Sequence, residues 1–280
     1  MRVLILGAAG IVGGAMRGEC ARRGWTPSAT DREAVDVTRR ETVARAVAAA
    51  DLVVNCAALT RVDDCETERE LAFRVNGEGA GIVAEEAARA GARAIQISTD
   101  YVFDGLSREP YREDHPTGPR SVYGASKLDG ERRALAAGAL VVRTSWVFGR
   151  GGPNFVDSIR GRIESGAGPL RVVDDQLGAP TWAPFLARAL ADLGESGADG
   201  IVHYQNREPV TWYGFACEIA RRMGRPVEIQ PVASAEFPRP APRPAYSVLD
   251  VSRFEALTGR RVELWSKGLE AHLEGAEERR

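Results

Sequence analysis

Lysine is almost missing from this sequence of 280 residues. Of its 37 basic residues, only Lys127 and Lys267 are lysines. The formal net charge of −2 argues against nucleic acid as the main partner. In a chain that otherwise uses arginine, a lysine marks a position where a compact, titratable ammonium differs most from a guanidinium. Lys127 is therefore the first candidate functional residue.

Paired cysteines and long hydrophobic runs are also missing. The four cysteines form no CxxC pair and no cluster with histidine at zinc-binding spacing, which predicts free thiols in a reducing compartment. No apolar run approaches the roughly 20 residues that span a bilayer. The apolar stretch in residues 1–7 is too short for the core of a signal peptide. We therefore expect a cytoplasmic protein without a membrane partner.

Compact apolar segments alternate with helical patterns through the first half of the chain, which predicts an α/β fold with a doubly wound parallel (Rossmann) sheet. The alternation loosens after residue 149. We expect residues 1–149, with about 182–204, to form an NAD(P)-binding core. Residues from about 150–181 and 205–280 are expected to form a smaller, partly interwoven lobe that binds a nucleotide sugar.

Three local predictions accompany this fold. Thr38 followed by Glu41 has the spacing of a capping box and predicts a helix from Thr38 to Ala50. Segment 66–89 is expected to be one long helical region. The proline-rich segment 231–244 is expected to be irregular and extended.

A glycine-rich turn follows the first strand. Gly7, Gly10 and Gly13 have dinucleotide-binding spacing, with Ile11 and Val12 inside the turn, and a helical pattern follows. Asp31 comes 18 residues after Gly13, where it would hold the adenosine ribose of NAD. Arg32 beside it could instead meet the 2′-phosphate of NADP, so the choice of cofactor stays open. Asp36 and Val37 are expected near the adenine, and Cys56, Ala57 and Ala58 near the ribose and pyrophosphate.

Tyr123 and Lys127 lie four residues apart in a segment with a helical pattern, so both can face one spot. A neighbouring cation favours the phenolate, and we expect Lys127 to lower the pKa of Tyr123 from its usual value of about 10. Such a phenol could donate and accept a proton near neutral pH.

These features resemble a known family. With Ser98–Gly105 and the Tyr123/Lys127 pair, the chain is similar to the extended short-chain dehydrogenase/reductases, and within them to the dTDP-4-dehydrorhamnose reductases. The strings that carry the second resemblance are Val53–Glu66, Leu71–Asn76, Arg143–Gly149, Asn154–Val156, Val172–Thr181 and Arg243–Ser247. The resemblance implies reduction of the 4-keto group of dTDP-4-dehydro-6-deoxy-L-mannose to dTDP-L-rhamnose by NADPH, with NADH possible.

The same resemblance assigns roles to residues. Thr99, Tyr123 and Lys127 match the catalytic triad, in which Lys127 also holds the nicotinamide ribose. Positions that match the sugar pocket are Thr60, Val62, Thr99, Asp100, Tyr101 and Trp146. Arg243 is a candidate for the ligand's diphosphate by its charge, with a purely structural role as the equal alternative. Asn154 and Gln176 are further candidates on the substrate side.

Two departures from the patterns of related proteins bear on a second activity and on a metal site. Nucleotide-sugar 4,6-dehydratases need an Asp-Glu pair after the threonine, whereas Thr99 is followed by Asp100 and Tyr101, which favours simple reduction. Some relatives form a dimer bridged by Mg²⁺ through a glutamate on the first helix. Ala15 stands at that place, so no metal site is expected.

Three functions remain open at this point: the rhamnose-pathway reductase, a 4-ketoreductase for another dTDP-deoxysugar, and a non-catalytic NADP-binding regulatory paralogue. An intact set of Thr99, Tyr123 and Lys127 counts against the third. The expected partner is a dTDP-sugar, and the protein is expected to be a monomer or a homodimer.

Overall fold

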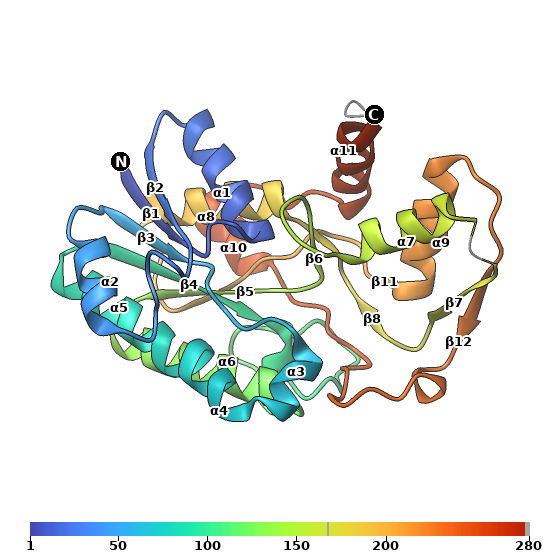
Figure 1. Cartoon of the computed structure of the whole chain (residues 1–280), viewed down its shortest axis with the longest axis horizontal. Helices are drawn as coiled ribbons and strands as arrows, with labels where there is room; N and C mark the ends of the chain where they lie inside the picture. Colours follow the sequence, from blue (N-terminus) through green and yellow to red (C-terminus); the bar gives the residue numbers. More distant parts are fainter. Residues whose placement is uncertain (167, 278–280) are drawn as a thin grey trace.

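The computed structural model describes residues 1–166 and 168–277, and its centre is a parallel sheet of six strands in the order β10-β5-β4-β3-β1-β2 (Figure 1). Each neighbouring pair is parallel. The strands are β1 (Arg2–Leu6), β2 (Thr26–Thr30), β3 (Leu52–Asn55), β4 (Arg93–Thr99), β5 (Leu140–Thr144) and β10 (Ile201–His203). The predicted α/β fold with a doubly wound parallel sheet is confirmed.

Helices cover both faces of this sheet (Figure 1). Successive side chains of a strand point to opposite faces, so Ile5 packs in the cluster with Met16 and Leu190, while Leu4 packs in the cluster with Val43. The first face carries α1 (Ile11–Arg22), α8 (Ala183–Ser196) and α10 (Ser252–Thr258), and the second carries α2 (Arg40–Val47), α5 (Ala80–Arg89) and α6 (Val122–Ala136). The near-continuous apolar strands follow from this double burial.

The order of the strands reverses between β1 and β3, because the chain first adds β2 on one side of β1 and then β3 on the other. In open α/β sheets, ligands bind outside the carboxyl ends of strands at such a switch point. The segments that follow β1 and β3 are the glycine turn and Cys56–Ala58. The topology therefore brings two of the predicted cofactor segments together.

A second, smaller group of elements has its own apolar cluster, and Figure 1 draws α7, α9, β7 and β12 at the far end of the long axis from β1 and β2. Its members are α7 (Phe155–Glu164), α9 (Trp212–Met223), α11 (Trp265–Glu277), β6 (Val147–Phe148) paired with β9 (Thr181–Trp182), β7 (Leu170–Val173) paired with β12 (Ile229–Val232), and β8 (Leu177–Gly178) paired with β11 (Val210–Thr211). Because α8 and β10 fall between these elements in sequence yet pack in and on the main sheet, the chain leaves that sheet and returns to it.

The predicted capping box at Thr38 is wrong. Helix α2 begins at Arg40, with Arg39 as its N-cap and no side-chain cap. The Thr38 hydroxyl instead donates to Asp36 Oδ1 at 2.7 Å, and the Thr38 amide donates to the same oxygen at 2.9 Å. An aspartate that captures the backbone two residues on forms a local turn, and this turn displaces the helix start.

The predicted helical region over 66–89 is present, interrupted only at Glu68. The segment divides into α3 (Val62–Thr67), α4 (Arg69–Ala72), the π-helix η1 (Phe73–Gly79) and α5. A side chain on Gly130 of α6 would lie 2.1 Å from the carbonyl oxygen of Asn76, so α6 packs directly on the π-turn. π-turns are frequent at functional sites.

The proline-rich segment 231–244 is irregular over most of its length, as predicted, but its first two residues lie in strand β12 (Ile229–Val232). Pro231 lies in β12, opposite Val172 of β7, and the 3₁₀ turn η3 (Ser234–Glu236) follows. Proline is accepted there because β12 pairs on one side only, which leaves its missing N–H without consequence for a ladder. Among the described residues, no helix is both long and apolar enough to cross a membrane.

Candidate active site

The glycine turn forms a cradle that side chains would fill. Gly7 has φ +75°, and a Cβ there would lie 2.9 Å from the Ala57 amide nitrogen. A Cβ on Gly13 would lie 2.3 Å from the Gly7 carbonyl oxygen. Helix α1 starts directly after Gly10 and has no acidic residue in its first turn. The first amides of a helix, here at Ile11 and Val12, lack acceptors within the helix and favour an anion.

Asp31 closes one side of this cradle, since its Oδ1 accepts a hydrogen bond from the Ala9 amide at 2.8 Å. Arg32 is exposed beside it. Val37 is buried and lies against the position of Gly79, whereas the pKa of Asp36 is lowered by its hydrogen bonds from Thr38. The structure thus places Asp31 at the turn and Asp36 in a separate local turn. Their cofactor roles stay predictions.

Cys56, Ala57 and Ala58 follow β3 on the other side of the switch point. The Ala57 amide donates to Asn55 Oδ1 at 3.1 Å, and burial raises the pKa of the Cys56 thiol to about 12. A thiol with that pKa stays neutral and acts as a small apolar group. Cys56 lies near Lys127, whose ammonium partly offsets the rise.

The three predicted catalytic residues converge at the carboxyl edge of the sheet. Thr99 is the last residue of β4 and is buried, and its hydroxyl lies near enough to Tyr123 to affect the pKa of that phenol. Tyr123 and Lys127 lie in the first turns of α6, which Ser121 caps by accepting from the Gly124 amide at 3.1 Å. The Lys127 ammonium is buried and donates to the Ile97 carbonyl at 2.7 Å. The predicted helical spacing is present.

The prediction that Lys127 lowers the pKa of Tyr123 is wrong. Burial raises the pKa of Tyr123 above its ordinary value of 10, and the nearby Thr99 hydroxyl opposes only part of this rise. Burial also lowers the pKa of Lys127 to about 8, with the Glu131 carboxylate partly opposing that change. At neutral pH the site therefore holds a neutral phenol and a charged ammonium, so Tyr123 is set to donate a proton.

Asp100 adjoins this group in the 3₁₀ turn η2 (Asp100–Val102). Its Oδ1 accepts from the Thr99 hydroxyl at 2.9 Å, and burial raises its pKa to about 7. Within the described residues, Oδ2 has no hydrogen bond of normal geometry, although the Ser247 hydroxyl lies near enough to oppose part of the rise. Thr99 has one hydroxyl proton, so a protonated Asp100, by donating to Thr99, would free that proton for a ligand.

Replacing Asp100 with asparagine should change how stability depends on pH. The folded protein holds the Asp100 proton up to about pH 7, whereas the unfolded chain loses it near 3.8. The carboxyl group therefore contributes stability below about pH 4 that is lost as the pH rises through 7. In urea unfolding at several pH values, Asp100→Asn should gain free energy of unfolding relative to wild type between about pH 4 and 7. A difference that is constant with pH would contradict the assignment.

Tyr101 and Arg243 lie beside these catalytic residues. The Tyr101 ring lies edge-on to Tyr123, with centroids 5.5 Å apart. The charges of Arg243 and Asp63 both act on the pKa of Tyr101, which burial raises. Arg243 pairs with Asp63 at 3.0 Å and donates to the Ala241 carbonyl at 2.8 Å. The structure thus gives Arg243 a position beside the site together with a structural partner.

Trp146 follows β5 at the same edge of the sheet, because Thr144 pairs with Thr99. Thr60 is exposed and Val62 half-buried at the start of α3, next to Asp63. Gln176 is half-buried just before β8.

Asn154 is engaged within its own segment. It caps α7 by accepting from the Asp157 amide at 3.0 Å and donates to the Gly149 carbonyl at 2.9 Å. The substrate roles of Asn154, Thr60, Val62 and Gln176 stay predictions.

Sequence reasoning assigned no role to Asn76, which connects two parts of the site. Its Oδ1 accepts from the Leu59 amide at 2.8 Å, and its Nδ2 donates to the Leu59 carbonyl and to the Ser126 hydroxyl at 3.1 and 3.0 Å. Asn76 therefore ties the loop after β3 to the residue before Lys127. Its place in the Leu71–Asn76 string was the only signal in the sequence.

Sequence reasoning also missed a second set of buried polar side chains close to Lys127. The Glu131 carboxylate accepts from Arg143 Nε at 2.8 Å, from Arg143 Nη2 at 2.7 Å and from the Ser98 hydroxyl at 2.5 Å. His203 lies 3.3 Å from Arg143. The positioning of Lys127 therefore rests on a buried ion pair between α6 and β5.

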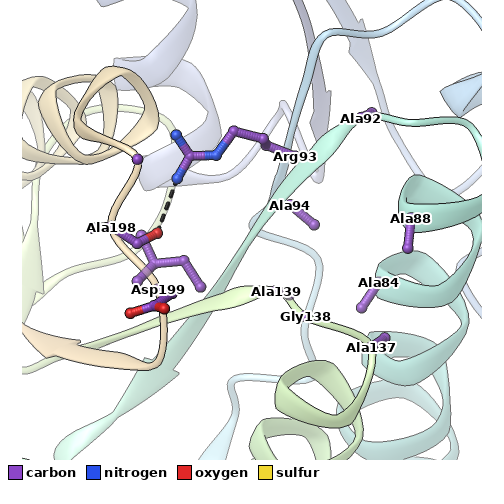
Figure 2. A pocket seen from close by; sticks show the side chains of 12 residues that line it. Ala84, Ala88, Ala92, Arg93, Ala94, Ala137, Gly138, Ala139, Ala198 and Asp199 are labelled. Atoms are coloured by element: carbon purple, nitrogen blue, oxygen red, sulfur yellow. Dashed lines mark hydrogen bonds between the residues drawn. The ribbon is translucent and has the colours of Figure 1, made fainter.

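Figure 2 shows a hollow lined mainly by alanines, which lies away from this site. Arg93 on its rim starts β4, and Leu140 in its lining starts β5, so the hollow faces the amino ends of the strands. Arg93 donates to the carbonyls of Gly194 and Ala198 at 2.7 and 2.9 Å, which ties the rim to the end of α8. Ligands of open α/β sheets bind at the carboxyl ends, so the candidate site is the edge at Thr99.

Comparison with known proteins agrees with this geometry. A dTDP-4-dehydrorhamnose reductase of Streptomyces griseus is 43% identical over 279 residues, covering 96% of this chain and 91% of the relative. A probable dTDP-4,6-dihydroxy-2-methyloxan-3-one 4-ketoreductase of Streptomyces antibioticus is 42% identical, with 96% and 93% covered.

A solved structure is also similar over nearly its full length. The dTDP-4-dehydrorhamnose reductase of Bacillus anthracis, determined in complex with NADP, superposes with a TM-score of 0.94 at 33% identity and covers 98% of this chain and 99% of that one. The model of the RmlD substrate binding domain family matches residues 1–277. The chain therefore belongs to the RmlD substrate binding domain family.

Proposed function

We propose that this protein reduces the 4-keto group of dTDP-4-dehydro-6-deoxy-L-mannose with NADPH, or with NADH, to give dTDP-L-rhamnose. The observation that carries the proposal is the convergence of Thr99, Tyr123 and Lys127 at the carboxyl edge of the sheet. It occurs in a chain 43% identical to a named dTDP-4-dehydrorhamnose reductase.

The residues around the switch point fit a nicotinamide dinucleotide. Side chains at Gly7 and Gly13 would clash with the backbone, and the amides that begin α1 directly after this turn would hold the pyrophosphate. Asp31, whose Oδ1 accepts from the Ala9 amide, would use its second carboxylate oxygen for a ribose hydroxyl. When bound, the cofactor supplies a hydride to the carbonyl carbon of the substrate.

The protein's own residues would then act on the 4-keto oxygen of the substrate. We assign Tyr123 as the acid that donates its phenolic proton to the 4-keto oxygen as negative charge develops there. Thr99 would donate a hydrogen bond to the same oxygen. The Lys127 ammonium would hold the nicotinamide ribose, the role that the family resemblance implies. Hydride and proton together convert the ketone to an alcohol, which balances the reaction.

The two groups of elements would divide the binding. We assign NAD(P)H to residues 1–149 with about 182–204, which hold the glycine cradle and the main sheet. Residues from about 150–181 and 205–280, which include Gln176 and Arg243, would bind the nucleotide sugar. The four cysteines of this protein are free, which suits a reducing compartment. We therefore propose that the protein is cytoplasmic, and that it is a monomer or a homodimer.

The deciding experiment mixes purified protein with dTDP-4-dehydrorhamnose and NADPH and follows the loss of nicotinamide absorbance. Turnover, with dTDP-rhamnose identified as product, is the expected result. The relative from Streptomyces antibioticus, named as a probable 4-ketoreductase of another dTDP-sugar, favours a second candidate function of the same chemistry. Turnover of only that second 4-ketosugar, in a parallel assay, would establish the alternative.

The cofactor preference is tested at Arg32. An exposed guanidinium beside Asp31 is placed to pair with the 2′-phosphate of NADPH, a group that NADH lacks. Arg32→Ala should raise the KM for NADPH about tenfold and that for NADH less than about twofold, as expected from loss of one charged hydrogen bond. Arg39→Ala, at another exposed arginine of the same region, is the matched control. Equal effects on both cofactors would show that Arg32 does not contact the phosphate.

A further inference from the structure

Trp146 has an unusual backbone conformation. Its φ is +45°, one of two positive values among the non-glycine residues that the structure describes. A bulky residue in the left-handed region is strained and persists only when its surroundings hold it there. The contacts around its indole therefore need an explanation.

One of these contacts is a face-to-face stack with Trp212. The ring centroids lie 3.5 Å apart and the planes differ by 6°. Phe155 of α7 supports Trp212 from a centroid distance of 4.6 Å. Trp212 is also the first residue of α9, and Thr211 before it caps that helix by accepting from the Gly214 amide at 3.1 Å. Trp212 is thus held by two helices of the smaller group.

Gly178 forms the second contact. A Cβ on Gly178 would lie 2.5 Å from Cε2 of Trp146 and 2.7 Å from Oγ of Ser247, so only glycine lets the indole lie flat there. Gly178 in β8 pairs directly with Val210 in β11, two residues before Trp212. The small sheet of β8 and β11 therefore holds Gly178 and leads directly into Trp212, the two residues that confine the Trp146 ring.

A series of contacts connects the Trp146 indole to the catalytic residue Thr99. Ser247, which shares the Gly178 contact with Trp146, is near enough to Asp100 to affect the pKa of that residue. Asp100 in turn accepts from the Thr99 hydroxyl. The backbone before Trp146 is fixed as well, since the Ser145 hydroxyl donates to the Ala179 carbonyl at 2.9 Å. This path leads from the stacked rings to Thr99, on the substrate side of the site.

From these contacts we infer that Trp212 and Gly178 are positioning residues that hold the Trp146 indole as a rigid wall of the sugar pocket. Neither residue contacts the reacting atoms, and both act through Trp146. The inference rests on the proposed function in one respect, that the ligand beside Trp146 is the sugar of a dTDP-sugar. A rigid aromatic wall contributes contact area at low entropic cost, because its orientation is set before the ligand binds.

The test is a double-mutant cycle on sugar binding. Trp212→Ala and Trp146→Ala are each expected to raise the KM for the 4-ketosugar about tenfold, with less than about twofold change in the KM for NADPH. The double variant should bind the sugar no more weakly than Trp146→Ala alone, because Trp212 has no effect without the ring that it positions. Trp212→Phe, which keeps an aromatic face, should recover most of the loss.

Gly178→Ala places a methyl group against the same ring. It should raise the KM for the 4-ketosugar in protein that keeps Trp146, and have no further effect when combined with Trp146→Ala. Trp25→Phe, at the edge of the sheet remote from the site, is the control and should leave all constants unchanged. Additive effects of Trp212→Ala and Trp146→Ala, or an equal rise in both KM values, would overturn the inference.

Binding of dTDP-L-rhamnose and of dTDP alone, measured by calorimetry on the same variants, separates this inference from the proposed function. The variants should weaken the dTDP-sugar and leave dTDP unchanged. If wild-type protein binds the dTDP-sugar without turnover, the proposed reductase activity is overturned. The coupling between Trp146 and Trp212 can still be measured from binding in that case. Equal weakening of dTDP and dTDP-sugar would place the indole against the nucleotide and overturn the inference.

Discussion

Tyr123→Phe should lower kcat about a thousandfold and leave the affinity for NADPH nearly unchanged. This result is expected because the variant removes the only proposed proton donor while retaining the ring and its edge contact with Tyr101. Burial keeps the phenol protonated through neutral pH, so the loss should be similar from about pH 6 to 8. Single-turnover measurements under saturating sugar and NADPH separate the chemical step from product release.

Tyr101→Phe is the comparator for this experiment. It removes a hydroxyl from the neighbouring aromatic ring and leaves the proposed acid in place, so it should act mainly on the KM for the sugar. Wild-type kcat in Tyr123→Phe would refute the acid assignment. Equal losses of kcat in both variants would indicate that packing of the two rings, rather than proton donation, had been disturbed.

Arg143→Met should lower the free energy of unfolding by about 3–5 kcal/mol, the cost of leaving one partner of a buried ion pair without the other. Arg143 and Glu131 are 2% and 1% exposed, so water cannot replace the lost guanidinium. The guanidinium also packs over the Phe103 ring at 4.9 Å, and that contact is lost with it. Urea unfolding, with the midpoint and slope fitted together, measures the change.

The double variant Arg143→Met with Glu131→Leu tests the cause. If the cost arises from the orphaned carboxylate, removing that carboxylate should restore part of the lost stability. Glu131→Leu alone should also be strongly destabilising, since it leaves Arg143 unpaired. A change below about 1 kcal/mol in Arg143→Met would mean that the pair contributes no more than an exposed one.

The sequence predicted those parts of the fold that depend on neighbours along the chain. The alternation of apolar segments with helical patterns correctly predicted the parallel sheet, because each pattern is local. The capping box at Thr38 failed because Asp36, two residues earlier, competes for the same hydroxyl. The two-residue strands β6, β8, β9 and β11 were missed because pairings this short leave no periodic pattern to detect.

The same distinction applies to the site. The placement of Tyr123 and Lys127 on one face of a helix could be predicted from their spacing, whereas their catalytic role was implied only by the family resemblance. The pKa of Tyr123 could not be predicted, because its largest cause is burial by other segments, which spacing does not report. The stack of Trp146 on Trp212 joins residues 66 positions apart, and the contact of Asn76 with Ser126 joins residues 50 positions apart. Tertiary contacts of this kind appear in one sequence only as unexplained polar or aromatic residues.

The return of the chain to the main sheet at β10 limits how this protein can be divided. Helix α8 buries Leu186, Leu190 and Leu193 against the sheet, and β10 pairs with β5, yet both follow the first half of the smaller group in sequence. A fragment that ends at residue 149 would lose α8 and α10 from one face of its sheet and β10 from its edge. A cut at this residue therefore does not divide the chain into two parts that each keep a complete core.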